Sequence, residues 1–147
     1  MSAAARMRDV LGDSFYEEHF APAPAHVSMM FVQIHGWDEM LAGMDSDDAV
    51  KLANSYFTVV EAAVYEYQGV LDQFLSHTGT VSIFWGRPLD QPNHADLAVQ
   101  TALAVRSATQ AWNERQQASE QPQLDIGIGI AAGDALVGDF GTRQRVS

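Results

Sequence analysis

The stretch from His26 to Asp38, HVSMMFVQIHGWD, constrains the fold of this chain more than any other segment. Residues Val27 to Ile34 are apolar on both faces except at two positions, which is typical of a buried central strand. Gly36 then supplies a turn, and Trp37 begins a helical pattern. A strand that runs through a glycine turn into a helix N-terminus is a common frame for an anion or metal site.

Length, charge and cysteine content narrow the class of protein. A chain of 147 residues suits one domain and can bury a real core. The net charge of −11 argues against nucleic acid or an anionic membrane surface as a partner. With no cysteine there is neither a disulfide framework nor a cysteine-based zinc site, and we expect a cytoplasmic protein. We expect no membrane span, because no apolar run reaches the necessary length.

We expect two regions, a lead-in over residues 1–25 and a domain over residues 26–147. The lead-in pattern predicts short helices over 3–11 and 14–20, followed by an extended segment that contains Pro22 and Pro24. Two interpretations of it stay open. It either packs on the domain or carries a dimer contact, or it is a partly ordered terminus.

Two long helices are expected within the domain. After a short helix over 37–44, the Asp45–Asp48 cluster predicts the N-cap of a helix that runs to about Gln68, with Gly69 at its C′ position. The second long helix begins behind Asn93, with Asp96 as capping-box partner, and continues toward Pro122. Its predicted core stripe is Leu97, Ala98, Thr101, Val105, Ala108 and Trp112.

The remaining apolar segments are expected to be strands. Residues 70–75 and 80–85 form a predicted hairpin around Ser76–Gly79. Residues 124–131 form another strand, and Gly133-Asp134 is expected to turn the chain into a last one over 135–140. The order βαββαβ, plus that appended strand, predicts a ferredoxin-like α+β fold, an antiparallel sheet with helices on one face.

Four segments in this order resemble a class III adenylate/guanylate cyclase homology domain. They are VSMMFVQIHGW, LANSYF, GVLDQFL with TVSIFWG, and LDIGIGIAAGDALVGDFG. Their family counterparts are V-x-x-L-F-A-D-I-x-G-F, L-N-x-Y-F, G-x-V-x-K-F-I-G-D-x-x-M-A-x-F-G and R-I-G-I-x-x-G-x-x-V-x-G-x-x-G. The GGDEF family shares the fold, but the hairpin carries no GGDEF-type turn.

The resemblance implies a chemistry. Such domains cyclise a nucleoside triphosphate by attack of the ribose 3′-hydroxyl on the α-phosphate, with two divalent metals held by two aspartates. A lysine and an acidic residue read the base, and an asparagine and an arginine on a later helix complete the site. The site forms between two subunits that pair head to tail.

Carried over residue by residue, the resemblance implies that this chain has lost the chemistry. Gln33 stands at the first metal position, where magnesium usually requires a carboxylate. The second metal position falls on His77 counted from the first hairpin strand, or on Gly79 counted from the second. Gln73 replaces the base-reading lysine. In the phosphate turn of His35, Gly36, Trp37 and Asp38, the Asp38 carboxylate would oppose a phosphate.

We therefore expect a degenerate, non-catalytic cyclase homology domain that serves as a regulatory, dimerisation or ligand-sensing module in signal transduction. The chain stops at Ser147, before the segment that would carry the later catalytic residues, which supports the same expectation. The expected partners are a second copy or another protein, with a nucleotide or other small ligand in the vestigial groove. No cofactor is expected. The alternative is the N-terminal part of an active cyclase that makes cAMP or cGMP from ATP or GTP with Mg²⁺ or Mn²⁺.

The same residues also have ordinary structural interpretations. Gln33 is also compatible with a polar residue at a strand end, and His77 with a solvated loop residue. A metal site built from His35, His77 and Asp72 is disfavoured, because strand alternation predicts that Asp72 and Gln73 point to opposite faces.

Overall fold

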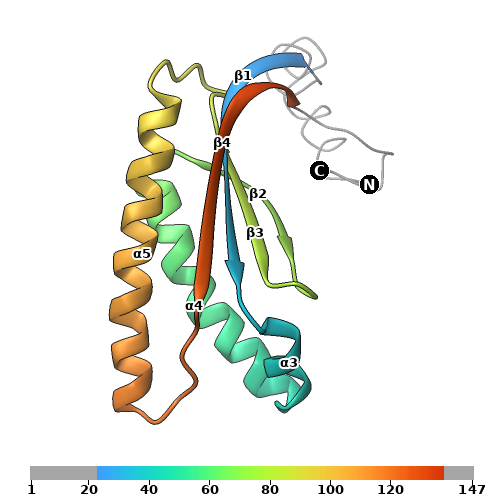
Figure 1. Ribbon diagram of the computed structural model, residues 1–147, viewed down its shortest axis with the longest axis vertical. Coiled ribbons are helices and arrows are strands. Elements are labelled where there is room, and N and C mark those ends of the chain that lie inside the picture. Colours follow the sequence, from blue (N-terminus) through green and yellow to red (C-terminus); the bar gives the residue numbers. More distant parts are fainter. Residues whose placement is uncertain (1–22, 138–147) are drawn as a thin grey trace, which may run out of the picture.

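The computed structural model describes residues 23–137 of the chain. Its elements, in chain order, are β1 (Ala23–Ile34), α3 (Trp37–Ala42), α4 (Ser46–Glu66), β2 (Val70–Leu75), β3 (Thr80–Trp85), α5 (His94–Ala118) and β4 (Ile126–Val137) (Figure 1). The helices predicted over 3–11 and 14–20 lie outside the described residues.

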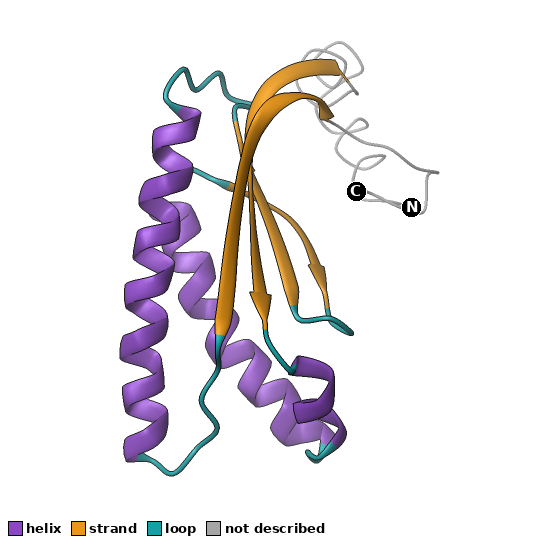
Figure 2. Cartoon of the chain, viewed as in Figure 1, coloured by secondary structure: helices purple, strands orange, loops and turns teal. Residues whose placement is uncertain are grey.

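The strands form one antiparallel sheet in the order β2-β3-β1-β4, and α4 and α5 cover one of its faces (Figure 2). Because β1 is central, the residue at its end, Gln33, is flanked by Thr80 of β3 and Gly127 of β4. This arrangement confirms the predicted α+β fold of the ferredoxin-like type.

The two longest strands differ from the prediction. β1 begins at Ala23 rather than Val27, and β4 continues to Val137 with no turn at Gly133-Asp134. The prediction of a separate strand over 135–140 was therefore wrong for residues 135–137, which continue β4 to the last described residue. The reason is the pairing of these strands: Val27 lies opposite Gly133 and His26 opposite Asp134, so the extended β1 holds this part of β4 in one ladder.

The core lies between the sheet and the two long helices. Alternate residues of β1 point into it, namely Met30, Val32 and Ile34. Tyr56 of α4 is fully buried there, and its ring makes an edge contact with Trp112 of α5 at 5.4 Å. The buried residues of α5 are His94, Ala98, Thr101, Val105, Thr109 and Trp112. Thr109 takes the place predicted for Ala108, and Leu97 is half-buried.

The end of α4 is a Schellman motif shifted by one residue from the prediction. Gln68 is the C′ residue, with φ of 61°, and its N–H donates to Tyr65 O, while Gly69 N donates to Val64 O. Gly69 is required for another reason. A Cβ there would stand 2.9 Å from the Trp85 indole, so only glycine lets the chain pass that ring.

The predicted N-cap positions of both long helices are right, but the predicted cap bonds are absent. Asp45 precedes α4 and Asn93 precedes α5, and neither side chain makes a capping hydrogen bond. The Asn93–Asp96 capping box is therefore not formed. Acidic residues in the first turn of each helix still favour the helix dipole.

The predicted hairpin has the bounds expected, with one irregularity. The pairing of β2 with β3 shifts between Leu71 and Gln73, so Asp72 is the extra residue of a β-bulge.

Among residues 23–137, no helix has the length and apolar character needed to cross a membrane.

Candidate functional site

The predicted site lies where β1 ends beside the β2–β3 hairpin turn. Gln33 is exposed there. The next residue, Ile34, donates its N–H to Gly79 O at 2.9 Å, and His35 N–H donates to Asp125 O at 2.8 Å. The fold thus brings together the end of β1, the hairpin turn and the start of β4.

The turn after β1 is a helix start with two acids. Gly36 adopts φ of 68° as the N-cap of α3, and Asp38 and Glu39 occupy the first turn. α3 spans six residues, so its helix dipole is small. An anion approaching the N–H groups of this turn would also meet these two carboxylates.

Trp37 is buried under the hairpin turn. Its Nε1–H donates to Ser76 O at 2.8 Å, and a Cβ built on Gly79 would stand 2.6 Å from its Cγ. Position 79 therefore has no room for a carboxylate. His77, the other position that the resemblance allows for the second metal acid, is exposed.

His35 lies over β4. Its Nε2 would be 3.1 Å from a Cβ on Gly127, the residue that pairs with Gln33 on one side. The imidazole therefore fills the space beside Gln33 that the small residue of β4 leaves open. This contact gives a packing reason for glycine at position 127, where the imidazole approaches the backbone of β4 closely.

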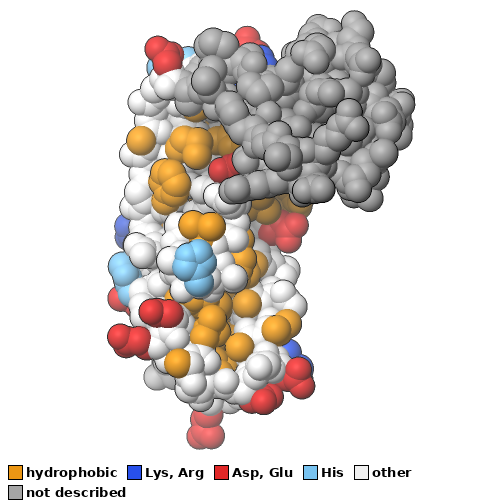
Figure 3. Space-filling model, turned by 90° about the vertical axis from the view of Figure 1, so that its right-hand side faces the viewer, with side chains coloured by type: hydrophobic (Ala, Val, Ile, Leu, Met, Phe, Trp, Pro, Cys, Tyr) orange, Lys and Arg blue, Asp and Glu red, His pale blue; other side chains and the backbone are white. Residues whose placement is uncertain are grey.

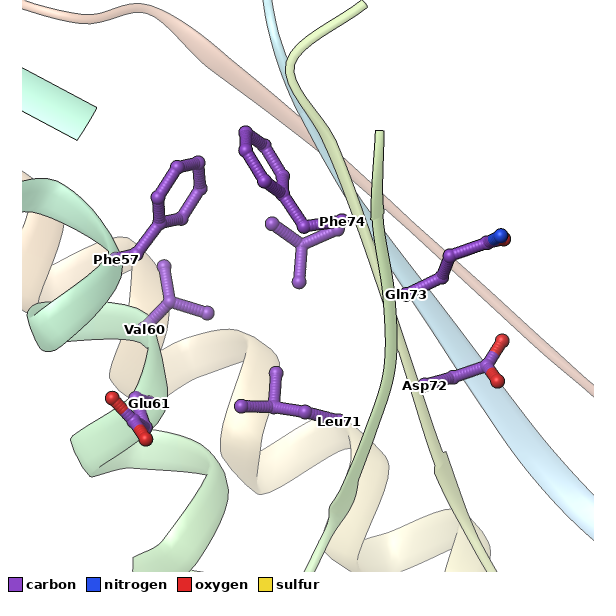
Figure 4. A pocket seen from close by; sticks show the side chains of 8 residues that line it. Phe57, Val60, Glu61, Leu71, Asp72, Gln73 and Phe74 are labelled. Atoms are coloured by element: carbon purple, nitrogen blue, oxygen red, sulfur yellow. The ribbon is translucent and has the colours of Figure 1, made fainter. Parts of the chain in front are cut away.

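Asp72 and Gln73 point to the same side of the sheet, away from the helices (Figure 4). The expected alternation was wrong here because the bulge inserts Asp72 as an extra residue. The Asp72 carboxylate accepts a hydrogen bond from Ser82 Oγ at 3.0 Å. Residues 23–137 contain no group of three or more His, Cys, Asp or Glu residues placed to hold a metal, so the site of His35, His77 and Asp72 is not formed.

The face of the sheet that turns away from the helices is partly apolar. Apolar side chains gather along the middle of the molecule when this side is viewed in Figure 3. Phe31, which points there from β1, is 43% exposed. The residues paired with Phe31 on the neighbouring strands are Ser82 and Gly129. Both are small, so the ring protrudes from this face of the sheet.

A second polar cluster at the other end of β1 was missed by the sequence reasoning. Ser28 Oγ and His94 Nδ1 are 2.6 Å apart and both residues are buried. The ring centroids of His26 and His94 are 4.9 Å apart, and His26 Nδ1 lies 3.1 Å from Asp134 Oδ1. Because Ser28 is fully buried, it has no access to a substrate, and the pair fastens α5 to β1.

Comparison with protein families gives one match over most of the chain. The family model described as "Adenylate and Guanylate cyclase catalytic domain" matches residues 21–146. Adenylate cyclase 1 of Rhizobium meliloti (strain 1021) is 31% identical over 120 residues, which cover 82% of this chain and 18% of that protein. The chain spans between 18% and 26% of the length of its curated relatives.

Solved structures share the fold. The guanylyl cyclase Cya2 superposes with a TM-score of 0.76 at 23% identity, over 87% of this chain and 63% of that one. The adenylyl cyclase CyaB from P. aeruginosa gives a TM-score of 0.76 at 25% identity, over 82% and 62% of the two chains.

Proposed function

This chain belongs to the adenylate and guanylate cyclase catalytic domain family, and from that premise we propose that it cyclises no nucleotide. Its role is that of a regulatory or dimerisation module in cytoplasmic signalling. The observation that carries the proposal is Gln33. It occupies the exposed end of the central strand, where the family pattern has a metal-binding aspartate.

An amide at this position removes the charge that a divalent metal requires. Gln33 offers one neutral oxygen, whereas Mg²⁺ is usually held in proteins through one or two carboxylates together with substrate phosphates. Its ladder neighbours, Thr80 and Gly127, add no acid. The Asp72 carboxylate, also on this face of the sheet, accepts a hydrogen bond from Ser82.

The electrostatics around the turn support the same proposal. A triphosphate at the start of α3 would face Asp38 and Glu39, on a chain whose net charge is −11. Without metal ions to screen these charges, like-sign repulsion weakens such binding. Any small ligand of the vestigial groove is therefore expected to be less anionic than a nucleotide.

The apolar open face supports pairing with a second copy or with a related domain. The exposed Phe31 ring gives this face an anchor of the kind that interfaces bury. We expect a homodimer or a complex with a partner protein. Sedimentation that detects only monomer at micromolar concentration, alone and with a candidate partner, would contradict this part of the proposal.

The test of catalytic silence is direct. The purified chain is incubated with ATP or GTP and Mn²⁺, and cAMP and cGMP are measured by mass spectrometry beside an active cyclase in the same buffer. We expect no product above that of heat-denatured protein. Product formed in proportion to the amount of this chain would overturn the proposal.

The alternative is that the chain is the front part of a working cyclase. The observation in its favour is that the chain covers only 62% to 63% of the two solved cyclases, so the compared domains are longer. A longer natural form that carries the family's N-x-A-x-R helix, and that makes cAMP or cGMP with Mg²⁺ or Mn²⁺, would establish it. A longer form without activity would support the silent module.

A further inference from the structure

One side chain of α5 anchors the connection that leads into β4. Residues 119–125 join the end of α5 to the start of β4 at the lower end of the molecule in Figure 1. Asn113 Nδ2 donates to Leu124 O at 2.7 Å, and Leu124 N–H donates to Asn113 Oδ1 at 2.8 Å. A single amide group therefore binds both backbone polar groups of Leu124, as a residue of a neighbouring strand would.

Leu124 is fixed from two sides. Its side chain is 4% exposed and belongs to the core between the sheet and the helices. Its backbone groups are held by Asn113, which is itself half-buried. Backbone groups in such a place lose free energy when they have no partner, so the amide of Asn113 is required for the position of Leu124.

Asp125 extends this anchor to the candidate site. The pairing of β1 with β4 begins at Ile34 and Ile126, so Asp125 lies one residue before β4. Its carbonyl nevertheless accepts the N–H of His35 at 2.8 Å. This bond continues the pairing by one residue into the turn after β1. It requires Asp125 to stay in line with β4, which the fixed Leu124 provides.

His35 in turn forms part of the surface beside Gln33. Its Nε2 would be 3.1 Å from a Cβ on Gly127, and Gly127 is paired with Gln33. The residue before it is held from the other direction, because Ile34 N–H donates to Gly79 O of the hairpin at 2.9 Å. Two consecutive N–H groups at the end of β1 are thus held by two different parts of the chain.

We infer that Asn113 is a positioning residue of the candidate site. From α5 it fixes the start of β4 and, through the Asp125 carbonyl, holds the backbone and the imidazole of His35 in place. That role rests on the proposed function, in which the groove at Gln33 is the ligand-sensing part of the module. A loop anchor without this role would affect only the overall stability of the domain.

Amide hydrogen exchange of the 147-residue chain, measured residue by residue by NMR, separates these two roles. The amide of Val32, in the buried middle of β1, reports opening of the whole domain. In Asn113→Ala we expect the protection of the His35 amide to fall at least about tenfold more than that of Val32. The Ile34 amide, held by the hairpin, should change no more than Val32.

Two matched variants test the route. Gln116→Ala removes the exposed hydrogen bond from Gln116 Nε2 to Pro122 O, in the same connection, and leaves Asn113 in place. Asp125→Ala removes the carboxylate and keeps the backbone carbonyl. Both should leave His35 exchange unchanged relative to Val32. The nuclear Overhauser effect between the His35 ring and Gly127 Hα should persist in both and be lost in Asn113→Ala.

Several results would overturn the inference. They are a His35 amide without protection in the wild-type chain, an equal change at His35, Ile34 and Val32 in Asn113→Ala, and an equal effect of Gln116→Ala. If circular dichroism shows that Asn113→Ala is unfolded, Asn113→Asp keeps the acceptor for Leu124 N–H and should shift His35 exchange in the same direction. These measurements contain no nucleotide, so cyclic nucleotide formed by the chain would overturn the proposed catalytic silence and leave the role of Asn113 standing.

Discussion

The indole of Trp37 occupies the space that any side chain at position 79 would need. A Cβ on Gly79 would stand 2.6 Å from Trp37 Cγ and 2.7 Å from Trp37 Cβ, and Gly79 has φ of 67°. The same indole donates to Ser76 O. The hairpin tip is thus fastened to the start of α3 by one buried side chain, and glycine at position 79 makes this packing possible.

A side chain at position 79 would have two costs, the left-handed φ and the clash with Trp37, and three glycine substitutions separate them. Gly129→Ala meets neither strain nor contact and should change the free energy of unfolding by less than about 1 kcal/mol. Gly36→Ala meets only the unfavourable φ of 68°, which we expect to cost about 1–2 kcal/mol. Gly79→Ala meets both, and we expect a loss of more than about 3 kcal/mol in urea unfolding.

The order of the three variants is the informative result. If Gly79→Ala were no more destabilising than Gly36→Ala, Trp37 would not be held against position 79. Gly79→Asp should be at least as destabilising as Gly79→Ala. Installing an acid at position 79 therefore rebuilds no metal site without first removing the indole.

Much of the fold follows from local patterns in the sequence. The hairpin strands end where predicted because Ser76–Gly79 is a polar turn between two apolar runs. The long helices follow from a three- to four-residue apolar period. What local patterns miss depends on partners distant in the chain. Only the pairing of Val27 with Gly133 explains why Gly133-Asp134 stays in a strand.

The candidate site was predictable in its position and not in its packing. The strand, turn and helix start around Gln33 follow from the His26–Asp38 stretch and the family resemblance. The bulge at Asp72 was not predictable, because a run of six residues reads equally well as a regular strand. The contacts of His35 with Gly127 and of Trp37 with Gly79 join separate elements, so no local pattern contains them.

The buried pair of Ser28 and His94 gives a second prediction. Ser28→Ala leaves the buried His94 Nδ1 without its partner at 2.6 Å. We expect a loss of about 1–3 kcal/mol in the free energy of unfolding. Ser107→Ala, on an exposed position of α5, is the matched control and should be nearly neutral.

The double variant decides whether that loss comes from the unpaired group. In Ser28→Ala with His94→Phe, both polar partners are gone, so we expect it to be more stable than the sum of the two single losses predicts. Additive losses in the same urea titrations would mean that the two side chains do not interact.

The C′ residue of α4 offers a stabilising substitution. Gln68 holds φ of 61°, a conformation that costs a residue with a Cβ about 1–2 kcal/mol and costs glycine almost nothing. We expect Gln68→Gly to raise the free energy of unfolding by up to about 1 kcal/mol. The gain is smaller than the relieved strain, because glycine also increases the entropy of the unfolded chain. Gln110→Gly, the same change on an exposed position inside α5, should lower it by about 1 kcal/mol. Two changes of the same sign would refute the assignment of Gln68 as the left-handed C′ residue.

The buried hydroxyl of Tyr56 predicts how stability depends on alkaline pH. Thr109 Oγ1 donates to Val105 O at 2.7 Å, so Tyr56 is the donor in its 2.8 Å hydrogen bond to Thr109 Oγ1. Burial raises the pKa of Tyr56 above its ordinary value of 10.0, because the charged phenolate is disfavoured away from water.

The direction of the effect follows from proton binding. Below pH 10 both the folded and the unfolded chain keep the phenolic proton, and the stability from this group is fully present. Above pH 10 the unfolded chain releases the proton more readily than the folded chain, so the free energy of unfolding falls as pH rises. Tyr56→Phe loses the hydrogen bond, which we expect to cost about 1–2 kcal/mol at neutral pH, but it removes this source of the decline.

The measurement is urea unfolding of wild type and Tyr56→Phe from neutral pH to above pH 10, with Tyr65→Phe as control. The exposed Tyr65 also has a raised pKa, through its hydrogen bond to Glu61. Because Tyr65 is exposed, its removal should change stability little at any pH. We expect the difference between wild type and Tyr56→Phe to shrink above pH 10. Parallel curves over the whole range would show that Tyr56 titrates alike in the folded and unfolded chains, because only a raised pKa in the folded state makes the two curves converge.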